Sequence, residues 1–148
     1  MAEQRFFEDV AAGDELTGVE YPLNVYRLVM AAGSNRDFNS IHHNTEYARS
    51  TGAGEMYANT SFLLSAWERC VRDWMGLGGE IRSIRDFRMR SFNVVGDTMW
   101  VRAHVAGKRL EGDAGVVDVA IRCENSNGIT VGPGTVEVVL PRRAESVK

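Results

Sequence analysis

The stretch that decides the fold runs from Tyr57 to Met75 and reads Tyr-Ala-Asn-Thr-Ser-Phe-Leu-Leu-Ser-Ala-Trp-Glu-Arg-Cys-Val-Arg-Asp-Trp-Met. Its apolar residues recur at the spacing of one face of an α-helix, and its charged residues occupy the other face. A large side chain contributes about 1.5–3 kcal/mol when it is buried, so this stripe must pack against another layer. We therefore expect a long helix whose apolar stripe consists of Leu63, Ala66, Trp67, Cys70, Val71 and Trp74.

The second half of the chain alternates apolar and polar residues, as strands do when one face is buried. Turns such as Glu111-Gly112-Asp113 and Asn127-Gly128 separate these segments. A short strand is expected at 17–23, followed by an amphipathic helix that Asn24 caps and that ends in a left-handed cap near Gly33. A long apolar helix followed by consecutive antiparallel strands predicts an α+β fold. The later strands are expected at 81–92, 98–108, 117–124 and 129–140, the last with a bulge at 132–134.

Length and composition indicate one ordinary globular domain over residues 1–148. The chain is 44% hydrophobic and 25% charged, and its net charge is -3. This charge provides no electrostatic footprint for nucleic acid, and no apolar run reaches the roughly 20 residues that span a membrane. The N-terminal residues lack a secretory pattern, so we expect a cytoplasmic protein. Cys70 and Cys123 lack metal-ligand spacing and are expected to be small buried thiols.

Residues 36–43, Arg-Asp-Phe-Asn-Ser-Ile-His-His, form the candidate site. Asp37 and His42 lie in a segment poor in helix formers, where a turn-rich loop can bring both side chains to one water molecule. A carboxylate and an imidazole that share a water form a general acid/base pair. The alternative is structural, with Asp37 capping a turn and His42 buried with its hydrogen bonds satisfied. A metal site is not predicted, because His43 points away from its neighbour in a loop and no third soft ligand is near.

This loop resembles the hydratase motif of the MaoC-like dehydratase/hydratase family, whose usual form is Gly-Asp-x-Asn-Pro-[Leu/Ile]-His-x5-Ala. The interval from Asp37 to His42 and the interval from His42 to Ala48 both match that form. Two positions differ, since Arg36 stands where the family has glycine and Ser40 where it has proline. The departures leave the acid/base pair intact.

Other segments resemble the same family, so the resemblance covers nearly the whole chain. These segments are the opening residues 7–14 and the turn 95–98. A further departure lies at the start of the central helix, where this chain has Asn59-Thr60 and the family has His-Gly. The loop, together with Asn59 and the later Asp73-Trp74, is similar to a narrower group. This group comprises the single-domain MaoC-like subunits of actinobacterial steroid side-chain degradation, which hydrate steroid enoyl-CoA thioesters.

The resemblance implies a hot-dog fold, in which a curved antiparallel sheet wraps around a long central helix. It also implies hydration of a trans-2-enoyl-CoA to the 3-hydroxyacyl-CoA, or the reverse dehydration, with coenzyme A as the substrate's carrier and no cofactor. Asp37 is expected to deprotonate the attacking water, and His42 to orient it and protonate the α-carbon. The backbone N–H of Thr60 is expected to stabilise the thioester oxyanion. Loop or supporting roles are expected for Arg36, Asn39, His43 and Asn59.

Partners and rival activities follow from the same resemblance. A sheet with an open edge predicts a homodimer, or a heteromer with a second MaoC-like chain. One rival is a hot-dog thioesterase, in which Glu68 on the central helix would direct water at the carbonyl carbon. The other is a non-catalytic subunit that shapes the tunnel of a partner. Six arginines are candidate contacts for the phosphates of coenzyme A, with an ordinary solvated strand face as the alternative: Arg82, Arg85, Arg88, Arg90, Arg142 and Arg143.

Overall fold

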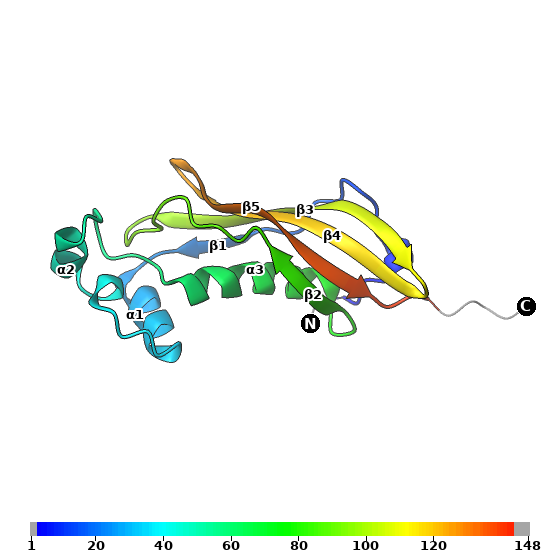
Figure 1. The fold of residues 1–148 in the computed structure, drawn as a ribbon, viewed down its shortest axis with the longest axis horizontal. Coiled ribbons are helices and arrows are strands. Elements are labelled where there is room, and N and C mark those ends of the chain that lie inside the picture. The colour runs from blue at the N-terminus through cyan, green and yellow to red at the C-terminus, as the bar shows by residue number, and fades with distance from the viewer. Residues whose placement is uncertain (1–2, 144–148) are drawn as a thin grey trace, which may run out of the picture.

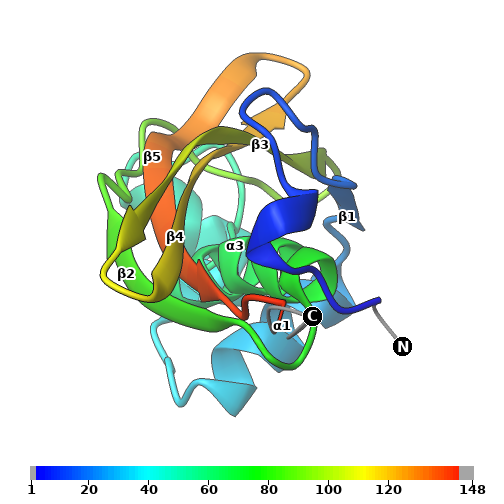
Figure 2. The same ribbon diagram turned by 90° about the vertical axis from the view of Figure 1, so that its right-hand side faces the viewer.

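The computed structural model describes residues 3–143 and shows a five-stranded antiparallel sheet wrapped around one long helix (Figures 1 and 2). This helix, α3 (Thr60–Met75), lies along the concave face of the sheet. The strand order is β1-β3-β4-β5-β2. The expected α+β hot-dog arrangement is confirmed. The strands are β1 (Val19–Pro22), β2 (Glu80–Arg85), β3 (Thr98–Glu111), β4 (Ala114–Asn125) and β5 (Gly128–Leu140).

The shorter helices gather at the N-terminal end of α3, on the left in Figure 1. They are α1 (Val25–Ser34), α2 (Thr45–Ser50) and the 3-10 turn η2 (Ser40–His42), whereas the turn η1 (Phe7–Asp9) precedes β1. Asparagine caps each of these three elements and α3 as well, because its side-chain oxygen accepts a backbone N–H that has no partner within the helix. These four N-caps are Asn24, Asn39, Asn44 and Asn59.

The apolar stripe of α3 is buried as predicted except at its C-terminal end. Trp74 is only partly buried, and Met75 takes the inward position with 1% of its surface exposed. After the helix the chain folds back over Met75, so that a Cβ at Gly79 would lie 2.9 Å from the Met75 side chain. Trp74 packs against the core as predicted but stays partly exposed, because this returning loop covers Met75.

The inner face of the sheet consists of the alternating residues that the sequence predicts, including Met99, Val101, Val119 and Ile121. The expected bulge in β5 is confirmed by a register shift opposite Ile121 and Cys123. The expected strand 81–92 stops early, because β2 ends at Arg85 and Asp86 has a φ of 57°. The β4–β5 turn is Ser126-Asn127, one residue before the predicted turn, since Asn125 pairs with Gly128.

Both cysteines are free and buried, as expected. Cys70 lies on α3 and Cys123 on β4, and both belong to the same hydrophobic core. Burial raises the pKa of the Cys70 thiol to about 11 and that of the Cys123 thiol to about 12. Both groups are therefore protonated thiols at neutral pH. Among residues 3–143, no helix is long and apolar enough to cross a membrane.

The face of the sheet that points away from α3 carries a network of ion pairs centred on Arg109. Its guanidinium lies 2.7 Å from Asp118 Oδ2 and 2.7 Å from Glu137 Oε2. Arg82 also contacts Glu111 and Glu137, and Arg85 contacts Asp118 and Glu137, so Glu137 is almost covered. The Arg109 hydrogen bond holds the pKa of Glu137 below its usual value.

Replacing Arg109 with Met is expected to lower the thermal midpoint by a few degrees at pH 7. A carboxyl group with a lowered folded pKa stabilises the fold above its unfolded pKa of about 4.3, and the stabilisation is lost as pH falls through the folded value. The difference from wild type should therefore shrink at pH 3. Thermal unfolding at both pH values measures this. Arg102→Met on the same strand removes a single ion pair, with Glu124, and should show a smaller version of the same effect. An equal loss at both values would assign the effect to packing of the arginine stem.

Candidate active site

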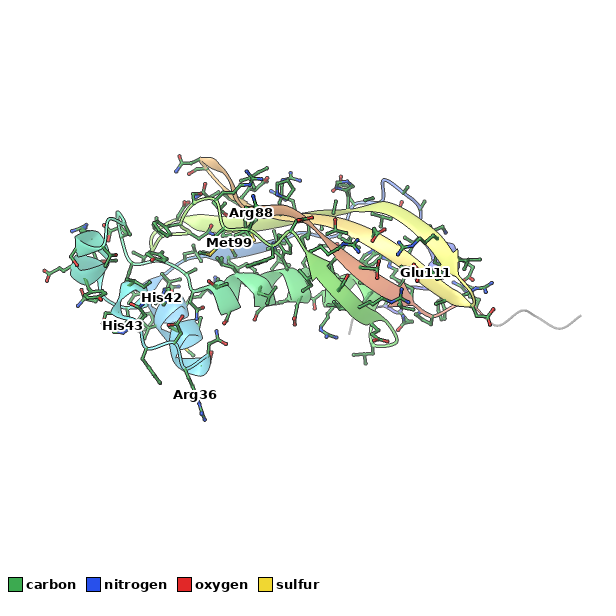
Figure 3. All side chains as sticks on the ribbon, viewed as in Figure 1. Arg36, His42, His43, Arg88, Met99 and Glu111 are labelled. Carbon is green, nitrogen blue, oxygen red and sulfur yellow. The ribbon has the colours of Figure 1, made fainter. Side chains whose placement is uncertain are left out.

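The C-terminus of α1 fixes the position of Asp37. The N–H of Arg36 donates to the Gly33 carbonyl at 3.1 Å, and the N–H of Asp37 donates to the Ala32 carbonyl at 2.9 Å. This pair of bonds is a Schellman motif, which needs a left-handed residue just past the helix. That residue is Arg36, with a φ of 55°, so the prediction of a left-handed cap at Gly33 is wrong. The position is the one where the family motif has glycine, and Figure 3 shows the Arg36 side chain pointing away from the molecule.

The turn η2 fixes the position of His42. Asn39 Oδ1 accepts from the Ile41 N–H at 3.2 Å and starts the turn, as the predicted loop role requires. The buried His42 ring has its Nδ1 2.8 Å from the Tyr57 carbonyl oxygen. A carbonyl oxygen only accepts, so Nδ1 carries a proton. The ring therefore presents Nε2 to the loop.

Asp37 and His42 meet directly. His42 Nε2 lies 3.1 Å from Asp37 Oδ2, with 8% of the His42 side chain and 37% of the Asp37 side chain exposed. Because Nδ1 already carries a proton, a neutral His42 would place an unprotonated Nε2 against the carboxylate. The contact is favourable only when one proton lies between Nε2 and Oδ2. The pair thus holds one exchangeable proton at a site that solvent reaches from the carboxylate side.

The N-terminus of α3 borders this pair. The Asn59 side chain is buried, and its Nδ2 donates to Asp37 Oδ2 at 3.2 Å. The first N–H groups of an α-helix have no partner within the helix, and they carry its partial positive charge. Asn59 Oδ1 accepts from the Phe62 N–H, which leaves the backbone N–H of Thr60 at the exposed tip of the helix. The arrangement places an acid/base pair beside a site that favours negative charge.

An apolar hollow lies close to this helix end. Met89, Arg90, Ser91 and Phe92 line a volume of about 260 Å³. Its wall connects to the site in two places. The Phe92 ring stacks on Tyr57 with centroids 4.1 Å apart, and Met89 Sδ is 3.7 Å from Thr60 Oγ1. A hollow of about 290 Å³ beside Trp74 lies near the other end of α3 and therefore away from the pair.

Other predicted residues lie outside this constellation. His43 is exposed, and its Nε2 is 3.5 Å from the Phe38 carbonyl oxygen. Glu68 lies two turns along α3 from Thr60, about 12 Å at 1.5 Å per residue. Within residues 3–143, no group of three or more His, Cys, Asp or Glu residues is placed to hold a metal ion.

The six arginines divide into three groups. Arg82 and Arg85 belong to the ion-pair network, and Arg142 and Arg143 pair with Glu8 and Asp9. The Arg90 guanidinium donates to the Gly132 carbonyl. Arg88 has no ion-pair partner within the described part of the chain, and Figure 3 shows it beside β5. Of these six arginines, only Arg88 and Arg90 are therefore available for an anionic ligand.

Two contacts of the site escaped prediction. The Tyr57 carbonyl that orients His42 comes from the residue 15 positions later, and the Asn59 amide reaches Asp37 across 22 positions. A backbone carbonyl carries no sequence signal. The sequence indicates Asn59 by its place at the start of the central helix, but it does not indicate the contact with Asp37.

The comparison with solved structures identifies the fold. No protein-family model and no curated protein sequence matches the chain. A chain of the ChsH1–ChsH2 complex from Mycobacterium tuberculosis matches with a TM-score of 0.80 and 25% identity over 88% of this chain and 98% of that one. The R-hydratase PhaJ1 from Pseudomonas aeruginosa matches with a TM-score of 0.80 and 20% identity over 96% and 91%. A MaoC-like dehydratase from Rhodospirillum rubrum matches with a TM-score of 0.80 and 22% identity, over 95% of this chain and 99% of that one.

Proposed function

We propose that this chain, which has the fold of the MaoC-like dehydratases and R-hydratases, hydrates a trans-2-enoyl thioester or catalyses the reverse dehydration. The observation that carries the proposal is the 3.1 Å contact between Asp37 Oδ2 and His42 Nε2 beside the start of α3. Hydration needs a base for the water, an acid for the α-carbon and a donor for the carbonyl oxygen. The site has one group of each kind.

The geometry supports a defined course of proton transfer. Asp37 takes a proton from the water as its oxygen bonds to the β-carbon, and electrons move from the double bond to the thioester carbonyl oxygen. The N–H of Thr60 stabilises this enolate. His42 then gives its Nε2 proton to the α-carbon, while Nδ1 stays bound to the Tyr57 carbonyl. After product leaves, a proton returns from Asp37 to His42, and no cofactor enters the balance.

The preferred substrate is a coenzyme A thioester with a bulky acyl group, such as a steroid side chain. The hollow beside Phe92 is apolar and borders the proposed oxyanion donor, which suits an acyl chain or the pantetheine arm. Arg90 lines this hollow and Arg88 precedes its first residue, and neither pairs with a carboxylate among residues 3–143, which suits a phosphate.

A second chain is expected to cover the open side of the site. Large apolar side chains on α1 and the loop 36–43 are exposed: Tyr26 by 80%, Met30 by 72% and Phe38 by 76%. A second chain packed on them would remove this apolar surface from water. The similar structure from Mycobacterium tuberculosis is a complex of two named chains, ChsH1 and ChsH2. We therefore propose a homodimer or a heteromer with a second MaoC-like chain.

A panel of enoyl-CoA substrates, from crotonyl-CoA to steroidal thioesters, tests the proposal. Hydration removes the absorbance of the conjugated thioester without releasing a thiol. Thiol release would instead indicate the thioesterase. Light scattering on the same preparation gives the oligomeric mass. If no substrate reacts with the chain alone or with an added MaoC-like chain, the hydratase assignment is wrong.

A further inference from the structure

Asparagine at a helix N-cap normally acts on the backbone alone. Asn24 and Asn44 do so, because each side-chain oxygen accepts an N–H, from Arg27 and Tyr47 respectively, at 2.9 Å. Asn59 differs, since its oxygen accepts from the Phe62 N–H at 3.1 Å while its nitrogen donates to Asp37 at 3.2 Å. One side chain thus joins the helix to the loop.

The direction of the Asn59 amide is fixed by the helix. The Phe62 N–H can only donate, so the Asn59 oxygen must face it and the NH₂ group must face Asp37. Asn59 is 2% exposed, which leaves it no alternative partner in solvent. Its N–H and His42 Nε2 converge on the same oxygen of Asp37, Oδ2. Within the described residues, the other oxygen, Oδ1, has only a long contact of 3.4 Å with the Asn39 N–H.

We propose that Asn59 is a positioning residue, whose amide holds Oδ2 of Asp37 against His42 and leaves Oδ1 to receive the proton of the attacking water. This inference rests on the proposed hydratase function and assigns the two carboxylate oxygens separate tasks. Without the amide, the Asp37 side chain can turn toward solvent, because more than a third of its surface is exposed.

The helix itself does not require an amide at this position. Aspartate caps a helix as well as asparagine does. At position 59, however, aspartate would put a second carboxylate about 3 Å from Asp37, where two carboxylates cannot both remain ionised. The chemistry of the site, and not the stability of α3, therefore selects asparagine here.

Asn59→Asp tests the inference, with Asn24→Asp as its matched control. Asn24→Asp changes an exposed N-cap and should keep the wild-type thermal midpoint. Asn59→Asp puts a buried carboxylate beside Asp37 and should lower the midpoint, so kcat is compared at a temperature well below both midpoints. Asn59→Asp should lower kcat about 10²-fold or more with little change in KM, because misplacing a reacting group has a cost of this order. Asn24→Asp should leave kcat unchanged. A wild-type kcat in Asn59→Asp would overturn the proposal.

Asn59→Ser provides a second variant that adds no charge. Serine also caps helices but lacks the amide donor, so the same loss of kcat is expected. Nitrogen NMR of the His42 ring reports on the contact between His42 Nε2 and Asp37 without the need for a substrate. Both variants should change the Nε2 resonance. If the wild-type protein hydrates no substrate but both variants still change the Nε2 resonance, the hydratase function is refuted and the positioning role is retained. An unchanged resonance in both variants would refute that role.

Discussion

Replacing Asp37 with Asn is expected to lower kcat for enoyl-thioester hydration about 10²–10⁴-fold, the usual contribution of one general acid or base. The amide has the shape of the carboxylate but takes no proton from water at neutral pH. Its oxygen still accepts from Asn59, so the loop should keep its conformation. The measurement is the loss of conjugated-thioester absorbance under saturating substrate.

The matched control for this variant is Asp73→Asn. Asp73 is an exposed carboxylate on α3 that pairs with Arg69 and lies far along the helix from Asp37. It should keep the wild-type kcat. His42→Ala should lose activity to a similar degree as Asp37→Asn. Turnover near the wild-type rate in a folded Asp37→Asn protein would show that this carboxylate is not the base.

Replacing Trp67 with Ala is expected to lower the free energy of unfolding by about 3–5 kcal/mol, the range for deleting a buried Trp or Phe ring. Trp67 has 0% of its surface exposed and meets Phe87 edge to face with centroids 5.0 Å apart. Its ring also lies under the β5 bulge, where a Cβ at Gly132 would be 2.9 Å from it. The cavity left behind borders a bulge and a helix, which cannot easily close it.

Urea unfolding at pH 7 measures this loss, and Trp74→Ala is the control on the same helix. Trp74 is only partly buried, so its removal should have a distinctly smaller effect. Equal losses in the two variants would contradict the packing described for α3. A loss confined to Trp67 would show that this fully buried ring stabilises the fold more than the partly buried ring of Trp74.

The sequence predicted the fold well because the fold depends on periodic burial. The stripe of α3 and the alternation in β3 and β4 are local patterns, and both are seen in the structure. The partial exposure of Trp74 and the early end of the 81–92 strand differ from the prediction, because the next segment of the chain decides both. Loop 76–79 covers Met75 in place of Trp74, and the left-handed Asp86 ends β2 early.

The candidate site was predictable only in its local part. Asp37 and His42 are joined by a Schellman motif and a 3-10 turn, which span few residues. The Tyr57 carbonyl and the Asn59 amide come from beyond α2, so their contacts depend on tertiary packing. The same holds for Arg109, whose carboxylate partners come from three different strands.

The two core cysteines have a practical consequence for distinguishing the rival activities. Thioester cleavage is followed by trapping free coenzyme A with a chromogenic disulfide reagent, which reacts with thiolates. Cys70 and Cys123 are buried and remain protonated until pH values of about 11 and about 12. The native protein should therefore add no colour of its own. Any signal above the blank would come from the substrate, and a slow rise without substrate would report unfolding.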